Sequence, residues 1–170
     1  MTLAGALLAS LALLAMGPAV DAVSASSADY GARVLDLVNA ARAEPRRCGW
    51  KRFPAAPPLA RSTMLESMAR EHAEDMALRR RMEHAGGDGS TPAERATRIG
   101  YRWLRIAENV AAGQATPEDA VASWLESAGH CANLMDPAYT ETGVGVAAAT
   151  AGEDGPVRTY WAQVFGTPAP

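Results

Sequence analysis

The chain is poor in the residues and motifs that mark several classes of protein. It has 170 residues but only two cysteines, three histidines and two phenylalanines. It contains no H-E-x-x-H, no paired C-x-x-C and no G-x-S-x-G, so common signatures of zinc proteases, zinc modules and serine hydrolases are absent. The formal charge of −3 and the pI near 5.6 argue against a nucleic-acid partner held by phosphate attraction.

The N-terminal apolar run is too short for a membrane span. It extends from Leu3 to Met16 and is followed by Gly17-Pro18 and small residues up to Ala25. Because a spanning helix needs about 20 apolar residues, this run predicts a secretory signal in residues 1–25, cleaved after Ala22 or Ala25. We therefore expect a secreted or periplasmic protein with no transmembrane anchor after cleavage. About 145 residues remain, enough for one domain.

The two cysteines, Cys48 and Cys131, are distant in the sequence, and the second is next to His130. In an exported protein such a pair favours a disulfide, which would hold His130 in place through its neighbour. Two alternatives stay open at this point. Both thiols are free, or Cys131 is a nucleophile assisted by His130.

Helices are predicted first along the chain and strands last. Four segments have the apolar spacing or the start signals of helices, namely residues 29–43, 63–83, 91–100 and 116–129. The second is expected to begin with a capping box formed by Thr63 and Glu66. Residues 46–58 contain three prolines and predict an irregular loop. Two β-prone runs predict a terminal hairpin, with a further short strand around 103–110; the runs are residues 143–150 and 157–165. This order favours an α+β domain of stacked layers.

Three side chains are candidates for a functional site. His84 precedes a glycine-rich loop, His130 follows Gly129 at the end of the fourth predicted helix, and Glu108 follows an apolar and aromatic stretch. Two imidazoles and a carboxylate that met in space would suit a divalent cation, most naturally Zn²⁺. His72 lies in the apolar stripe of the second helix and is expected to be a hydrogen-bonded core residue.

In combination, several short motifs resemble those of the bacterial branch of the CAP superfamily. Its eukaryotic relatives are cysteine-rich secretory proteins, insect venom antigens and plant pathogenesis-related proteins of group one. The resemblance extends from about Asp29 to Gly166. It is carried by Leu37–Arg42, His84 with Asp88-Gly89-Ser90, Gly100-Tyr101, Glu108–Ala111, Trp124, Gly129-His130 with Asn133–Met135, Gly143–Val146 and Tyr160–Phe165.

The resemblance implies a CAP (SCP-like) domain over residues 29–168. The implied fold is a three-layer α-β-α sandwich with a central antiparallel sheet and a large cleft. The implied site is a tetrad of two His and two Glu that holds a divalent metal in some members. His84, Glu108 and His130 match three of its positions. Glu126 or Ser127 stands near the fourth, and Ser127 in that position would leave a triad.

Two functions are compatible with this resemblance. In the first, the protein is a secreted binding or interaction module for a divalent metal, a lipid or sterol, or another small-molecule or extracellular protein ligand, without an established catalytic reaction. The alternative is a metal-dependent hydrolase or protease, in which Zn²⁺ on His84 and His130 activates water and Glu108 is the base. The first is favoured, because a catalytic zinc normally has three protein ligands and a separate base.

Overall fold

The computed structural model describes residues 19–152 and 155–170, with side chains from residue 30 onward. The predicted signal segment therefore lies mainly outside the described residues. Its last part, from Ala19, belongs to the first helix, α1 (Ala19–Arg42), which begins earlier than the helix predicted from residue 29. Among the described residues, no helix is long and apolar enough to cross a membrane.

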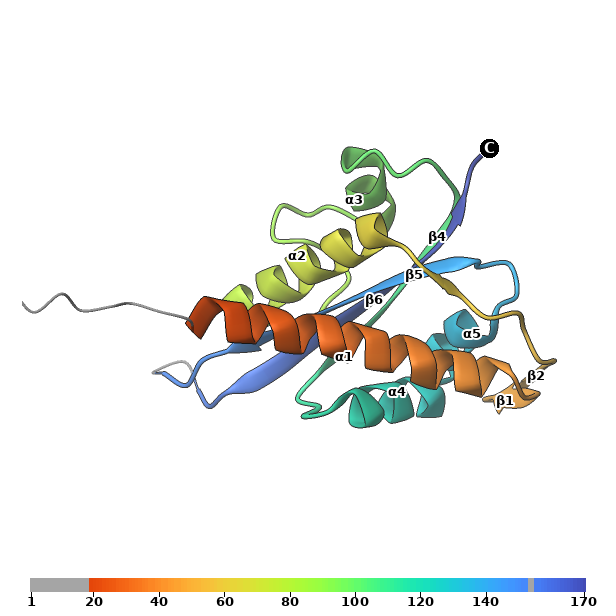
Figure 1. Ribbon diagram of the computed structural model, residues 1–170, viewed down its shortest axis with the longest axis horizontal. Helices are drawn as coiled ribbons and strands as arrows, with labels where there is room; N and C mark the ends of the chain where they lie inside the picture. Colours follow the sequence, from red (N-terminus) through yellow and green to blue (C-terminus); the bar gives the residue numbers. More distant parts are fainter. Residues whose placement is uncertain (1–18, 153–154) are drawn as a thin grey trace, which may run out of the picture.

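Four strands form the main sheet in the order β3-β5-β6-β4 (Figure 1). The predicted hairpin is confirmed: β5 (Glu141–Ala149) pairs with β6 (Arg158–Pro168) in antiparallel register from Glu141↔Gly166 to Ala149↔Arg158. The predicted third strand is β4 (Trp103–Ala112), which pairs antiparallel with the other side of β6. A short strand that was not predicted, β3 (Ala60–Arg61), runs parallel to β5. The long strands thus form an antiparallel sheet with β4 at one edge.

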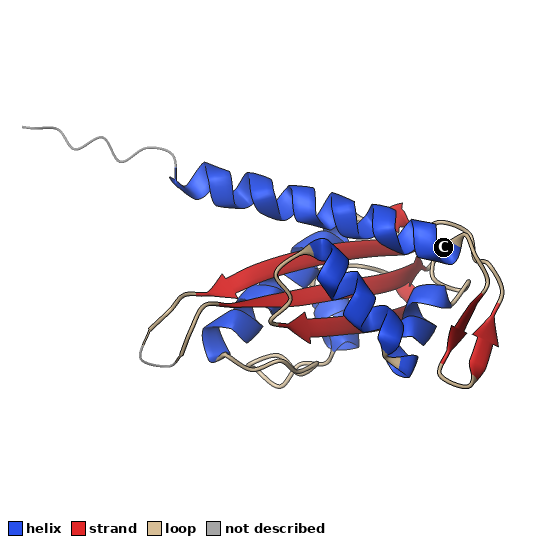
Figure 2. Ribbon diagram, turned by 90° about the horizontal axis from the view of Figure 1, so that it is seen from below, coloured by secondary structure: helices blue, strands red, loops and turns tan. Residues whose placement is uncertain are grey.

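Helices cover both faces of this sheet, so the chain is an α-β-α sandwich, as the resemblance implied (Figure 2). One core lies between the sheet and two helices, α2 (Thr63–Arg79) and α3 (Pro92–Arg98). The other lies between the opposite face and α1, α4 (Pro117–Glu126) and α5 (Ala128–Met135). The central strand β6 is buried from Tyr160 to Gly166, because its side chains enter both cores.

Two glycines in β5 allow α2 to lie directly on the sheet. A Cβ atom on Gly143 would lie 2.0 Å from the backbone nitrogen of Glu66, and one on Gly145 would lie 2.2 Å from that of Arg70. No side chain fits at such separations. The alternate residue Val144 is 6% exposed and packs into the core on the other face. The Gly-Val-Gly-Val motif therefore has a packing role.

The segment predicted as an irregular loop contains a small hairpin, which is a correction. Strands β1 (Arg46–Cys48) and β2 (Lys51–Phe53) pair antiparallel around a two-residue turn, Gly49-Trp50. Gly49 has φ +60°, as the first turn residue of a type II′ hairpin requires. The prolines that suggested a loop come after the hairpin. The sequence signal for it was Gly49 between two short basic runs.

Helix boundaries needed three further corrections. The N-cap of α2 is Ser62, which makes no side-chain capping bond, so the predicted capping box at Thr63 was wrong. The helix ends at Arg79, before the predicted end at residue 83, because Arg80 adopts a left-handed conformation. The fourth predicted helix is two helices separated at Ser127. By contrast, the predicted starts at Thr91 and Thr116 are confirmed, and each hydroxyl accepts a capping hydrogen bond.

The predicted disulfide between Cys48 and Cys131 is present and joins β1 to α5. It lies in a third, smaller core with Phe53 and Met135. The alternatives of free thiols or a nucleophilic Cys131 are thereby excluded for the oxidised protein. A Cβ atom on Gly49 would lie 2.9 Å from the Cβ of Ala128, so the hairpin also packs closely against the start of α5.

Candidate functional site

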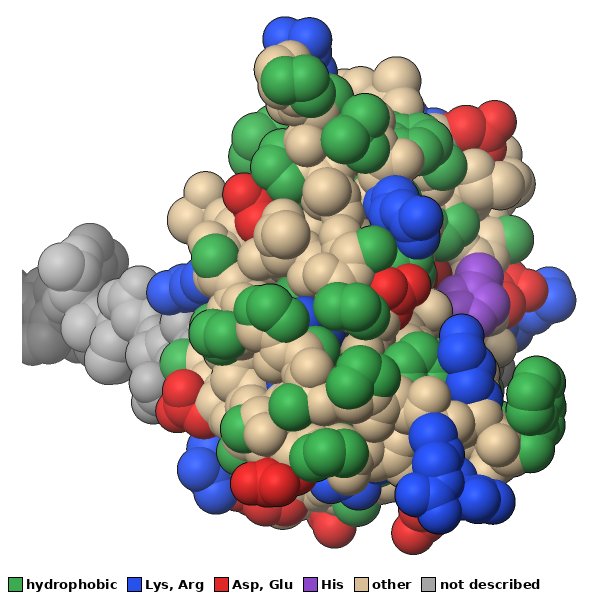
Figure 3. Space-filling view, turned by 90° about the vertical axis from the view of Figure 1, so that its right-hand side faces the viewer, with side chains coloured by type: hydrophobic (Ala, Val, Ile, Leu, Met, Phe, Trp, Pro, Cys, Tyr) green, Lys and Arg blue, Asp and Glu red, His purple; other side chains and the backbone are tan. Residues whose placement is uncertain are grey.

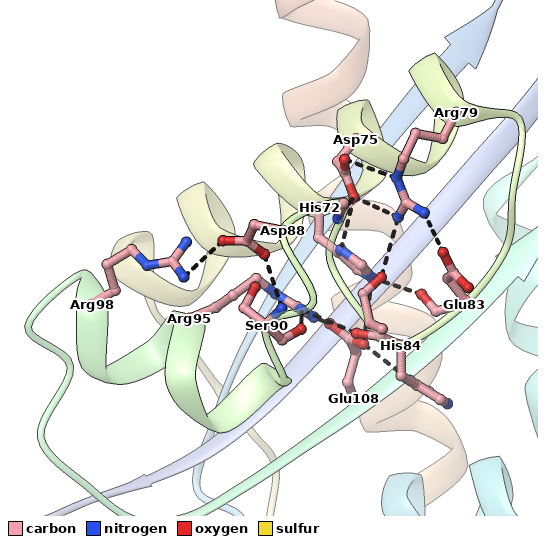
Figure 4. Close-up of polar contacts among 12 residues, drawn as sticks. His72, Asp75, Arg79, Glu83, His84, Asp88, Ser90, Arg95, Arg98 and Glu108 are labelled. Atoms are coloured by element: carbon pink, nitrogen blue, oxygen red, sulfur yellow. Dashed lines mark hydrogen bonds and ion pairs between the residues drawn. The ribbon is translucent and has the colours of Figure 1, made fainter.

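Glu108 is the centre of a buried polar network near the edge of the sheet (Figure 4). Its side chain is 1% exposed. One carboxylate oxygen, Oε2, accepts a 2.6 Å hydrogen bond from Nη2 of Arg95. The other, Oε1, lies 3.0 Å from Nδ1 of His84 and 3.6 Å from Nε2 of His72. A buried carboxylate is costly without partners, and here each oxygen has one.

Arg95 is placed by the start of α3. Thr91 and Glu94 form a complete capping box, and Pro92 occupies the first helical turn. This fixes the helix start, and the Arg95 side chain is directed to Glu108. Its Nη1 also donates to the carbonyl oxygens of His84 (3.0 Å) and Ser90 (2.8 Å). The same guanidinium therefore neutralises Glu108 and holds the loop that carries His84.

His84 is the partly exposed member of this network, because it follows the end of α2 in the loop. Its side chain is 53% exposed, and the pKa of His84 is raised by the hydrogen bond to the Glu108 carboxylate. When the ring is neutral, Nδ1–H donates to Glu108 and Nε2 is left with its lone pair. No hydrogen bond from that nitrogen to any described residue is present. His84 thus has one nitrogen held by the protein and one available to a ligand.

His72 is buried in α2, as predicted, and 2% exposed. Its Nε2 donates to the backbone carbonyl of Glu83 at 2.9 Å, which ties the end of the His84 loop to α2. Burial lowers the pKa of His72. The burial of His72 agrees with the predicted core position. Its Nε2 atom nevertheless lies 3.6 Å from Oε1 of Glu108, so the ring is also beside the site. His72 therefore packs against the buried side of the network.

His130 comes to the site from the opposite face of β4. Neighbouring residues of a strand point to opposite faces, so Glu108 faces α2 and α3 while Asn109 faces α5. Asn109 donates to the carbonyl oxygen of His130 at 3.1 Å and accepts from Asn133 at 2.9 Å. The Glu-Asn motif therefore fixes elements on both sides of the edge strand.

The structure places His130 inside α5, although the sequence predicted it at a helix end. Its ring is half-buried, and the pKa of His130 is lowered by burial and by the charge of nearby protonated His84. The two imidazoles are therefore close enough to interact electrostatically. Of the predicted set, the structure joins His84 and Glu108 by a hydrogen bond, whereas the His130 side chain forms no hydrogen bond or ion pair with either among the described residues.

The fourth predicted position is not part of this group. Glu126 is exposed at the end of α4, and no hydrogen bond or ion pair of its side chain with a described residue is present. Ser127 is half-buried between α4 and α5, where its carbonyl accepts from the amide of Cys131 at 2.8 Å. Neither residue supplies a second carboxylate beside His84.

The donor set does not fit a divalent cation in this arrangement. Both oxygens of Glu108 have protein partners, and the Arg95 guanidinium places a positive charge where a cation would need an anionic ligand. Two imidazoles remain, fewer than the three protein ligands of a typical zinc site. In residues 30–152 and 155–170, no three His, Cys, Asp or Glu side chains form a group that could hold a metal.

A polar pocket of about 270 Å³ adjoins the network and is lined by His72, Asp75, Ser90 and Arg95, among others. Neither His84 nor His130 lines it. Sequence reasoning had missed Arg95, which the capping signal at Thr91 could have indicated by fixing the helix start. It had also missed the role of Asn109 and Asn133, for which the alternation of side chains along β4 was the available signal.

These features match a known family. The model of the CAP, cysteine-rich secretory protein, family matches residues 35–165, so the chain belongs to this family. The chain is 32% identical over 116 residues to the uncharacterised protein YkwD of Bacillus subtilis strain 168. That match covers 68% of this chain but 42% of the relative, so the chain spans less than half of the relative's length.

Solved structures show the same fold. An extracellular protein with an SCP domain from Bacillus anthracis has a TM-score of 0.71 at 24% identity, covering 88% of this chain and 44% of that one. A cysteine-rich secretory protein from Staphylococcus aureus has a TM-score of 0.60 at 15% identity, covering 82% and 38%. An outer surface protein from Borrelia burgdorferi has a TM-score of 0.57 at 19% identity, covering 81% and 94%.

Proposed function

We propose that the chain is an exported CAP domain that acts as a binding module through His84 and His130. The observation that carries the proposal is the state of Glu108. Its oxygens are bonded to Arg95 and His84, and its side chain is 1% exposed, so it is not available as a general base to a substrate or water. The groups left for a ligand are two half-exposed imidazoles.

The chemistry of these groups defines the kind of ligand. An imidazole accepts a hydrogen bond when neutral and donates from both nitrogens when protonated, so the pair suits an acidic or hydroxyl group. The carboxylate of a fatty acid or the hydroxyl of a sterol is such a group. A ligand that bridged His84 and His130 would cross the edge of the sheet at β4.

An extracellular place of action is part of the proposal. Its support is the predicted signal segment, together with the description of the B. anthracis protein as extracellular. The disulfide Cys48–Cys131 agrees, because structural disulfides persist in oxidising compartments.

A titration of the three histidine rings by NMR tests the proposal. The probes are acetate, inorganic phosphate, a short-chain fatty acid, a soluble sterol sulfate and ZnCl₂, each added to the secreted protein labelled at the imidazole nitrogens. We expect an acidic probe to shift His84 and His130 together while the buried His72 shifts less. Either His84→Ala or His130→Ala should abolish the response, whereas Glu126→Ala, the matched control, should retain it.

The same samples are assayed for turnover with ester and peptide substrates. Turnover that requires zinc, His84 and His130 would replace the binding module with the hydrolase of the alternative hypothesis. Shifts from ZnCl₂ alone, at low metal concentration, would show that Arg95 moves away from Glu108 and would restore the metal site. No response of either ring to any probe would reject both functions.

A further inference from the structure

The β1–β2 hairpin is a basic surface feature of the described chain. Residues 46–53 contain four of the 16 Lys and Arg residues and no acidic residue. Arg47, Lys51 and Arg52 are exposed, and Arg46 is half-buried. None of the four forms an ion pair or donates a side-chain hydrogen bond within the described part of the chain, and Glu44, the nearest acid in sequence, does not pair with them.

Two of these charges oppose each other across the hairpin. The register pairs Arg47 with Arg52, and residues directly opposite in an antiparallel pair project from the same face. Like charges in this position destabilise a strand pair. Elsewhere in the chain, several exposed arginines have acidic partners, for example Arg61 on Glu66 at 2.7 Å and Arg33 on Glu118 at 2.7 Å. The hairpin leaves a repulsive pair without a counter-ion among the described residues, so both guanidinium groups are open to an external anion.

The tip of the hairpin carries an exposed indole. Trp50 is 88% exposed, the highest value among the large apolar side chains with described burial. It follows Gly49 in the tight turn, and the disulfide at Cys48 anchors the strand immediately before the turn. Figure 3 looks onto this end of the molecule, where Lys and Arg side chains gather at the lower right and Asp and Glu side chains lie along the lower edge of the view. A turn anchored by the disulfide therefore presents an amphipathic ring beside cations that have no acidic partner among the described residues.

We infer that this hairpin docks on the surface of an anionic phospholipid bilayer. Trp partitions to the boundary between headgroups and acyl chains, and Arg and Lys bind the lipid phosphates beside it. The arrangement of residues fits that boundary: Trp50 at the tip would enter the interface, while Arg47 and Arg52, which share one face of the hairpin, would contact the headgroups. Each basic residue near an anionic surface strengthens binding about five-fold.

Other polyanions fit this surface less well. Sugar recognition by an aromatic ring needs acceptors as well as donors for the hydroxyl groups, and the side chains of residues 46–53 provide no amide or carboxylate. Nucleic acid would be attracted to the hairpin, but the net charge of −3 opposes a larger contact with a polyanion. A bilayer requires only the small protruding hairpin.

Vesicle binding tests the inference on protein secreted into the medium, with the same N-terminus in every variant. The probes are vesicles of pure phosphatidylcholine and vesicles with added phosphatidylglycerol, including a brominated lipid that quenches tryptophan. We expect binding to the anionic vesicles only, with quenching of Trp50. Arg47→Ser with Arg52→Ser should weaken binding about 25-fold, at five-fold for each charge. Trp50→Ala should remove the quenching.

A matched control removes two exposed arginines elsewhere, Arg70→Ser with Arg102→Ser, and should retain binding because it changes the net charge equally. Equal losses in the two double variants would show that net charge acts without the hairpin and would overturn the inference. Binding to soluble heparin or DNA with no binding to vesicles would reassign the surface to a polyanion. Absence of binding to every probe would also reject it, while circular dichroism verifies that the variants are folded.

Discussion

The network around Glu108 and the β1–β2 hairpin differ in whether their charged side chains have partners of opposite charge. Around Glu108, a buried carboxylate contacts an arginine and a histidine, and the arginine also satisfies two backbone carbonyls. On the hairpin, four basic residues have no acidic partner within the described part of the chain, Lys51 instead lies over the Phe53 ring at 4.6 Å, and Arg47 and Arg52 face each other. Charges of the first kind are part of the folded structure. Charges of the second kind cost stability and remain available to another molecule.

The largest expected effect comes from breaking the buried pair. Glu108→Gln should lower the free energy of unfolding by about 3–5 kcal/mol, because it leaves the Arg95 guanidinium buried without an opposite charge. Denaturant unfolding measures this. The double variant Glu108→Leu with Arg95→Met should lose less unfolding free energy than the sum of the losses in the two single variants. The exposed pair gives the control: Glu66→Gln, which removes the partner of Arg61, should cost less than about 1 kcal/mol.

Removing the disulfide is expected to be the next largest effect. Cys48 and Cys131 are 83 residues apart, and closing a loop of this length stabilises a protein by about 4.5 kcal/mol on the chain-entropy model. Cys48→Ser with Cys131→Ser should therefore cost about 2–4 kcal/mol in unfolding experiments. Hydrogen exchange should rise first in β1 and β2. Exchange that rises equally over the central strand β6 would instead show that the hairpin and the main sheet unfold together.

The pH dependence of the unfolding free energy should distinguish the imidazole of His84 from that of His130. The pKa of His84 is raised above 6.5 by Glu108, so its stabilising contribution is complete below that pH and is lost as pH rises through the raised pKa. The difference in unfolding free energy between wild type and His84→Ala should then be larger near about pH 5.5 than near about pH 8.5. For His130, whose pKa is lowered, the order should be reversed. The same trend for both variants would contradict the assigned partners.

The smallest effect is expected from the hairpin charges, and it should have the opposite sign. Arg47→Thr relieves the repulsion from Arg52, so the free energy of unfolding should rise by about 0.2–1 kcal/mol. Thermal unfolding at low and high salt measures it, and the gain should shrink as salt screens the charges. A loss of stability would show that Arg47 has an internal partner, and the contrast with Glu108 would then fail.

Much of the fold followed from local signals in the sequence. Thr91-Pro92 and Thr116-Pro117 set the starts of α3 and α4, because a capping hydroxyl and a proline act within one turn. The β5–β6 hairpin followed from two adjacent β-prone runs. The break at Ser127 was not visible, because neither helix end there has a side-chain capping bond. The parallel strand β3 pairs with a residue range about 80 positions away and has only two residues, so no local pattern marks it.

Only part of the candidate site could be predicted from the sequence. His84, Glu108 and His130 were candidates from their sequence positions and matched the family resemblance, and the structure joins His84 directly to Glu108 while Asn109 holds the backbone of His130 across β4. Glu126, near the fourth family position, is exposed at the end of α4. Arg95 changed the chemistry of the group, and its contact with Glu108 depends on the angle at which α3 meets the sheet.

The sequence by itself determined the helices with caps, the terminal hairpin and the presence of one cysteine pair. Each depends on a short segment or on a residue type with a single stable outcome. Tertiary structure alone decided which charges have partners. Glu108 and Arg95 meet because a strand and a helix pack together, whereas Arg47 and Arg52 meet because their hairpin closes beyond the reach of any described acid. Pairing of charges depends on distances of a few ångströms between distant segments, and those distances arise only when the layers assemble.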